Sequence, residues 1–199
     1  RLRDYLPDDK LRFLRYAYLF SKYGHRGAFR KSGERYFNHP RRSALIILDE
    51  LNILDEHELI EAILLHDQRE DALLLDAWLI ELIFGVEVMR IVNFVTKDER
   101  RKHLYFKILI QSGNWRAMLV KCCDRLDNIR TVHHMSHEKI PIQIKETRDE
   151  FPAVINALAR CAPPKYAWVA TVLGSKIFEA CDVQESLWEI AEADKKKKR

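Results

Sequence analysis

The sequence predicts an all-α fold, a helical bundle built as a single domain. Apolar residues recur at helical spacing through most of the chain, as in residues 10–22, where Leu11, Leu14 and Tyr18 share one face. No stretch keeps the alternating pattern of a β-strand. The 199 residues include only six glycines and six prolines, which argues against a loop-rich β fold.

The first predicted helix is followed by a basic loop. Gly24 and Gly27 interrupt the helical pattern, and residues 26–38 form the loop. Pro40 fits the first turn of a second helix, because proline has no amide hydrogen to lose there, and that helix continues through residues 44–51.

The next helix contains the most apolar run of the chain, residues 60–65. We expect Asp55 to cap its first turn, with Glu58 three residues later as an acidic capping box. Further helices are expected over residues 79–85, 86–95, 102–110, 117–135, 142–158 and 168–193.

Residues 66–71, His-Asp-Gln-Arg-Glu-Asp, follow the apolar run directly. If the helix continues, His66 and Glu70 lie on one stripe and Asp67 and Asp71 on the neighbouring stripe. Unpaired buried charge is costly, and a divalent metal would neutralise it. The hexapeptide therefore predicts a metal site at the end of this helix.

Further ligand candidates lie upstream at His39 and downstream at Asp124. Together with His66 and Asp67 they would form a mixed nitrogen and oxygen site. Such a site suits Mn(II), Fe(II), Co(II) or Mg(II) better than an ion that prefers thiolates.

The order of these motifs resembles the hydrolase domain of the Rel/Spo family, whose members are HD-domain metal phosphohydrolases. The resemblance covers residues 17–158. It rests on seven segments in order: residues 30–36, His39-Pro40, His66-Asp67 with Glu70-Asp71, Phe84-Gly85, residues 95–97, residues 124–126 and residues 128–131. It implies an all-α HD-type bundle that removes pyrophosphate from the alarmones ppGpp and pppGpp.

The resemblance also implies a role for each site residue. It implies the metal ligands His39, His66, Asp67 and Asp124, the catalytic carboxylates Glu70 and Asp71, and a nucleotide pocket formed by Arg30, Lys31, Ser32, Asn128 and Thr131. Mn(II) is the expected metal, with other divalent ions as alternatives. Six histidines lie outside this pattern and are expected at the surface: His25, His57, His103, His133, His134 and His137.

The chain departs from the family at several positions. Gln68 and Arg69 stand where small or β-branched apolar residues are usual, Ala72 replaces a common threonine, and Asp127 stands where many members have His or Tyr. Because no implied ligand or catalytic carboxylate is lost, these departures bear on substrate preference rather than on the metal.

Two other functions stay open. One is an HD phosphohydrolase for another nucleotide, such as NADPH or a deoxynucleotide. The other is a binding module that has lost catalysis. The chain ends where longer family members begin a synthetase domain, so we expect a small stand-alone hydrolase. Its oligomeric state cannot be read from the sequence.

The charge pattern separates a near-neutral body from a basic tail. The net charge is +4, but the last five residues are all basic, and without them 29 positive residues face 30 negative ones. We therefore expect an HD hydrolase domain over residues 1–194 and a disordered tail over 195–199, with no nucleic-acid partner and no membrane contact. Four cysteines without Cys-x-x-Cys spacing indicate reduced core residues in a cytoplasmic protein.

Overall fold

The computed structural model describes residues 1–68 and 77–197, which are mostly helical and contain no β-strand. The all-α prediction is confirmed. The described α-helices are α1 (Asp8–Gly24), α2 (Asn38–Leu45), α3 (His57–Leu65), α5 (Ala77–Phe84), α6 (Val86–Val95), α7 (Tyr105–Gln111), α8 (Trp115–Arg130), α9 (Lys139–Cys161) and α10 (Val169–Lys197). None of them is long and apolar enough to cross a membrane.

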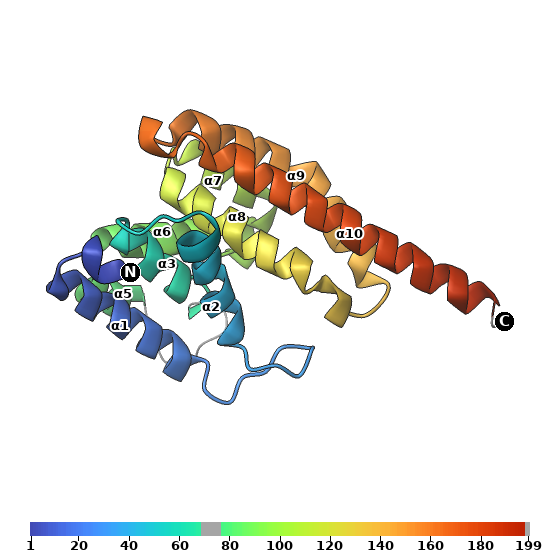
Figure 1. The fold of residues 1–199 in the computed structure, drawn as a ribbon, viewed down its shortest axis with the longest axis horizontal. Helices are drawn as coiled ribbons and strands as arrows, with labels where there is room; N and C mark the ends of the chain where they lie inside the picture. Colours follow the sequence, from blue (N-terminus) through green and yellow to red (C-terminus); the bar gives the residue numbers. More distant parts are fainter. Residues whose placement is uncertain (69–76, 198–199) are drawn as a thin grey trace.

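Helix α8 is the central helix of the bundle. It contacts α2, α3 and α6 on one side and α9 and α10 on the other (Figure 1). Helices α9 and α10 lie side by side, and α10 extends beyond the bundle to the C-terminus. The loop between α1 and α2 lies at the lower end of the molecule in Figure 1. Central placement of α8 brings Asp124 close to residues from α2 and α3.

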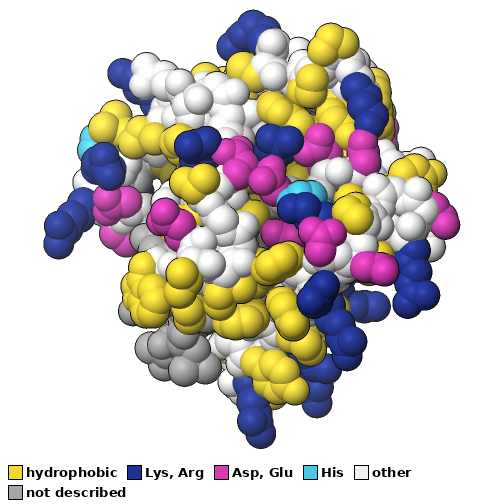
Figure 2. All heavy atoms as spheres, turned by 90° about the vertical axis from the view of Figure 1, so that its left-hand side faces the viewer, with side chains coloured by type: hydrophobic (Ala, Val, Ile, Leu, Met, Phe, Trp, Pro, Cys, Tyr) yellow, Lys and Arg dark blue, Asp and Glu magenta, His cyan; other side chains and the backbone are white. Residues whose placement is uncertain are grey.

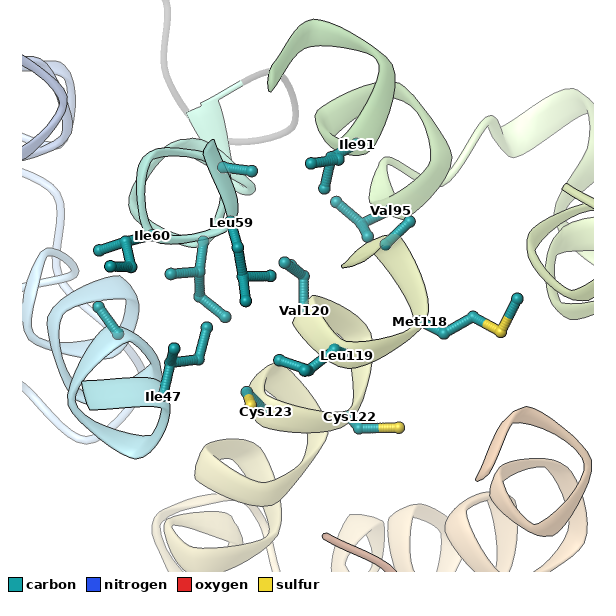
Figure 3. Packing of buried hydrophobic residues seen from close by; sticks show 14 of the residues in the cluster. Ile47, Leu59, Ile60, Ile91, Val95, Met118, Leu119, Val120, Cys122 and Cys123 are labelled. Atoms are coloured by element: carbon teal, nitrogen blue, oxygen red, sulfur yellow. The ribbon is translucent and has the colours of Figure 1, made fainter. Parts of the chain in front are cut away.

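The core is built where α3, α6 and α8 meet the turn after α2. Ile47, Leu59, Ile91 and Leu119 point into this core and are almost completely buried (Figure 3). Helix α3 is apolar on nearly every face, with residues 59–65 all buried, which is the pattern of a helix enclosed by others. A fully enclosed helix holds the residue at its end in a fixed position.

Each helix expected over residues 79–193 has a counterpart in the structure, but most of the ends differ from the predicted ones by one to five residues. Helix α6 matches its predicted range, whereas α8 ends at Arg130 and gives way to a 3₁₀ turn, five residues before the prediction. The Asp55 cap is wrong, because α3 begins at His57 without a side-chain cap. Asp55 instead accepts a hydrogen bond from the hydroxyl of Tyr166 at 2.7 Å, so it joins two distant segments.

Candidate metal centre and nucleotide pocket

His66 lies immediately after α3, whose last residue is Leu65. The helix therefore does not continue unbroken through the hexapeptide: His66 and Asp67 form a turn. The Nδ1 of His66 donates to the carbonyl of Ile63 at 2.7 Å, and this fixes the ring. Its buried Nε2 has no hydrogen-bond partner among the described residues, although Asp67 Oδ1 lies 3.1 Å away.

His39 lies in the first turn of α2, and its Nε2 points toward the same place as the Nε2 of His66. Its Nε2 lies 3.1 Å from Asp124 Oδ1 and 3.4 Å from Asp67 Oδ2. On the far side of the ring, Nδ1 donates to Asp127 Oδ2 at 2.7 Å. Asp127 in turn accepts from the Nε of Arg42 at 2.6 Å. The imidazole is thus held between carboxylates on both edges.

Asp124 reaches the site from the middle of α8 and is almost completely buried. Its Oδ1 lies 3.7 Å from His66 Nε2 and accepts a hydrogen bond from Asn128 at 2.5 Å. Its Oδ2 accepts from the ammonium of Lys121 at 2.7 Å. These donors leave Oδ1 directed toward both imidazoles.

The convergence of these groups fits a divalent ion. One ligand atom each from His39, His66 and Asp67 lies within 4.8 Å of the other two, and Asp124 Oδ1 approaches both rings. The Nε2 of His66 is buried and has no hydrogen-bond partner among the described residues. Leaving its lone pair unsatisfied in the protein interior costs stability unless an ion or another group binds it. A set of two imidazoles and two carboxylates suits Mn(II), Fe(II), Co(II) or Mg(II).

Electrostatics at the site are consistent with a cation. Burial lowers the pKa of His39, but hydrogen bonds to Asp124 and Asp127 outweigh this and raise it to about 9. Burial likewise opposes charge on His66, while Asp67 and Asp124 raise its pKa above the ordinary value. Burial disfavours the Asp124 carboxylate, but Lys121 and the two imidazoles hold its pKa well below its usual range. Positive charge, as protons or as a metal, is therefore favoured here.

Three side chains behind Asp67 form a second polar layer. The hydroxyl of Tyr36 donates to Asp67 Oδ2 at 3.3 Å, and the ring of His25 stacks on Tyr36 with 4.7 Å between centroids. The predicted surface position of His25 is wrong, because the residue is buried and Gln68 Nε2 lies 2.8 Å from its Nδ1. Gln68 thus contacts His25 rather than opening to solvent.

Arg30 links the loop to the end of α8. Its guanidinium donates to Asn128 Oδ1 at 2.6 Å and lies 3.5 Å from Thr131 Oγ1. The predicted pocket residues Arg30, Lys31, Ser32 and Thr131 line one cavity of about 330 Å³. Asn128 contacts both Arg30 and Asp124, so it joins this cavity to the candidate metal centre.

Two lysines lie near Asp124 and add positive charge. The ammonium groups of Lys97 and Lys121 lie 5.6 and 5.3 Å from the centre of the Tyr105 ring. Burial and the nearby Lys121 lower the pKa of Lys97. Such a group of cations suits phosphate oxygens. The predicted catalytic carboxylates Glu70 and Asp71 lie outside the described residues.

Comparison with known proteins identifies the family. A sequence pattern described as an HD domain matches residues 17–160, which include His39, His66, Asp67 and Asp124. The chain belongs to the HD-domain family. Its homologues are Rel/Spo proteins, as the motif order predicted.

The HD domain is similar to part of several longer proteins. It is 36% identical to a GTP pyrophosphokinase of Myxococcus xanthus, over 98% of this chain and 26% of that protein. It is 31% identical to the bifunctional (p)ppGpp synthase/hydrolase SpoT of Escherichia coli, over 79% of this chain and 23% of SpoT. The chain thus spans about a quarter of the length of these relatives.

A solved structure is similar over nearly the whole HD domain. It is that of a metazoan SpoT ortholog that hydrolyses ppGpp, with a TM-score of 0.66 and 25% identity. The match covers 88% of this chain and 95% of that one. The matched part of the chain therefore has the HD-domain fold.

One residue that contacts this HD site was not identified from the sequence. Asp127 was noted only as a departure from the family pattern, yet it accepts a hydrogen bond from the back of the His39 ring. The signal was its position three residues after Asp124, which places both carboxylates on one face of a helix. Helix α2 packs against α8, and this contact places the His39 ring between the carboxylates of Asp124 and Asp127.

Proposed function

We propose that this HD domain is a metal-dependent (p)ppGpp 3′-pyrophosphohydrolase, releasing pyrophosphate and GDP or GTP. The observation that carries the proposal is the convergence of the buried His39 and His66 with the half-buried Asp67, where His66 Nε2 has no hydrogen-bond partner among the described residues. The relatives named as ppGpp hydrolases support the substrate class.

In this proposal His39, His66, Asp67 and Asp124 hold one ion, with Mn(II) the expected one. When bound, the ion would act as a Lewis acid toward a phosphate oxygen and acidify a water molecule. The hydrogen bond from His66 Nδ1 to Ile63 keeps the proton on that nitrogen, so that Nε2 presents its lone pair. Asp127 does the same for His39.

The chain's other polar groups orient the substrate and move the proton. Arg30 offers a flat guanidinium for a purine, braced by Asn128 and Thr131. The ammonium groups of Lys97 and Lys121 would offset the negative charge of the diphosphate. Glu70 and Asp71 are proposed, on the family resemblance, to orient the attacking water and accept its proton.

A substrate panel tests the proposal. Purified protein is supplied with Mn(II) and offered ppGpp, pppGpp, NADPH and a deoxynucleoside triphosphate at equal concentration, and product is measured for each. We expect the alarmones to have the highest kcat/KM. Higher kcat/KM for NADPH or the deoxynucleotide would reassign the substrate, and tight binding without turnover of any of them would favour a silent binding module.

The proposed location is the cytoplasm. The four cysteines are free, and Cys122 and Cys123 lie in the core, where burial raises the pKa of both thiols. Such thiols are inert, which suits a reducing compartment. No part of the site uses them.

A further inference from the structure

The loop between α1 and α2 separates two cavities. Phe29 and Arg35 pair across a short hairpin, closed by hydrogen bonds such as that from the amide of Arg30 to the carbonyl of Glu34 at 2.9 Å. Alternate residues of an extended chain point to opposite faces. The proposed alarmone pocket is lined by Arg30, Lys31, Ser32, Glu34 and Tyr36. The second cavity is lined by Arg35 and Phe37, and Phe29 lies between the two and lines both.

The second cavity has a volume of about 710 Å³ and is lined by four cations that have no carboxylate partner among the described residues. Lys22, Arg26, Arg35 and Arg41 line it, and its described lining contains no carboxylate. Within the described residues none of the four forms an ion pair. Clustered like charges repel, so the cavity favours an anion.

The local sequence is strongly basic around this cavity. Residues 21–42 contain seven Lys or Arg and a single carboxylate, Glu34. Glu34 faces the other cavity, where it accepts hydrogen bonds from Arg42 at 2.7 and 2.9 Å. Lys and Arg side chains gather at the lower end of the face in Figure 2, with no Asp or Glu visible among them.

Aromatic rings line the same cavity. Tyr18, Tyr23 and Phe29 are 37%, 60% and 63% exposed, and they lie together on the lining of one cavity rather than scattered over the surface. Exposed rings next to arginines offer stacking surfaces for a base. The cavity volume falls in the range of small-molecule sites, roughly 300–1,000 Å³.

We propose that this cavity is a second nucleotide site, which binds a nucleoside polyphosphate apart from the alarmone pocket. The phosphates lie against Arg35, Arg41 and their neighbours, and the base lies against Tyr23 or Phe29. A bounded hollow suits a single nucleotide better than a nucleic-acid strand, which needs an extended basic groove. The site goes beyond the proposed hydrolysis and does not depend on it.

The second site also touches the side chains behind the metal centre. His25 lines the cavity and stacks on Tyr36, whose hydroxyl donates to Asp67. A bound nucleotide would therefore contact the layer that holds one of the proposed metal ligands.

Equilibrium dialysis of GTP against the full chain in EDTA tests the site, because hydrolysis that needs a metal is then absent. Arg35→Ala/Arg41→Ala removes two cavity cations. The matched control Lys107→Ala/Arg160→Ala removes two exposed cations that form no ion pair within the described residues. Circular dichroism confirms that each variant folds.

We expect the Arg35→Ala/Arg41→Ala variant to lose at least about tenfold in GTP affinity, the scale of one charged hydrogen bond, while the control binds like the parent. Arg30→Ala, in the other pocket, keeps this GTP binding. Tyr23→Ala weakens binding of GTP but not of inorganic pyrophosphate.

Three results would overturn the proposal. Parent-like GTP binding by Arg35→Ala/Arg41→Ala refutes the site, and loss of all GTP binding in Arg30→Ala assigns the nucleotide to the alarmone pocket alone. If a single-stranded oligonucleotide binds more tightly than GTP, and this binding needs Arg35 and Arg41, the ligand of the cavity is a nucleic acid and not a single nucleotide. A failure of ppGpp hydrolysis would leave each of these readouts unchanged.

Discussion

Replacing Asp127 by asparagine removes a negative charge behind the His39 ring while keeping an oxygen that can accept its hydrogen bond. In the structure Asp127 Oδ2 lies 2.7 Å from His39 Nδ1, and Arg42 lies 2.6 Å from Oδ1. Loss of such an outer partner costs about 10- to 100-fold in metal affinity, or about 1.4–2.8 kcal/mol. We expect Asp127→Asn to fall in this range.

The assay is a Mn(II) titration of EDTA-treated protein against a competing chelator, under nitrogen and near pH 9. His39 has a pKa of about 9, so about half of the imidazole has lost its proton at that pH and the proton competes less with the metal than at neutral pH. Glu34→Gln is the control, because Glu34 contacts Arg42 but not His39. Mn(II) affinity of Asp127→Asn equal to that of the parent would refute the idea that the negative charge of Asp127 strengthens His39 as a ligand.

Three further predictions concern catalysis, binding and stability. Glu70→Gln keeps the metal but loses at least ~10²-fold in kcat on ppGpp, the scale of a water-orienting group; parent-like kcat would remove that role. Arg30→Ala raises KM for ppGpp and leaves metal content unchanged, because its contacts form in ground and transition states alike; an unchanged KM would move the base elsewhere. Burial raises the pKa of Glu61 from 4.5 to about 8, so the folded state favours the protonated acid and stability is lost as pH rises through that range. Denaturant titrations at about pH 5 and pH 9 should therefore show that the parent loses roughly 4 kcal/mol more stability than Glu61→Gln, and equal losses would contradict a buried, protonated Glu61.

Elements with strong local signals were predictable from the sequence. Helix α6 was predicted to the residue, because a glycine precedes it and marks its start. In the structure Gly85 has a φ of 91°, a conformation that other residues avoid. The apolar run that ends at Leu65 likewise predicted a buried helix leading to the site. The end of α8 was predicted too late, because the apolar pattern continues beyond Arg130. Val132 is buried as that pattern implies, but it lies in a 3₁₀ turn and not in α8.

Roles set by tertiary contact were not predictable. Asp55 has the residue type of a helix cap, but Tyr166, more than a hundred residues away, takes its carboxylate. His25 follows a helix and precedes a glycine-containing loop, which suggested exposure, yet Gln68 covers it. In the same way the contact of Asp127 with His39 depends on two helices crossing. The roles of Glu70 and Asp71 stay predictions.

The most direct test of the metal-dependent hydrolysis is pyrophosphate release from ppGpp by EDTA-treated protein, with and without added Mn(II), for the parent and His66→Ala. Because His66 Nε2 is buried and has no hydrogen-bond partner in the described part of the chain, we expect release only from the parent and only with Mn(II). Circular dichroism establishes that His66→Ala is folded. Release at the same rate in EDTA, or by His66→Ala at the rate of the parent, would contradict the proposed metal centre.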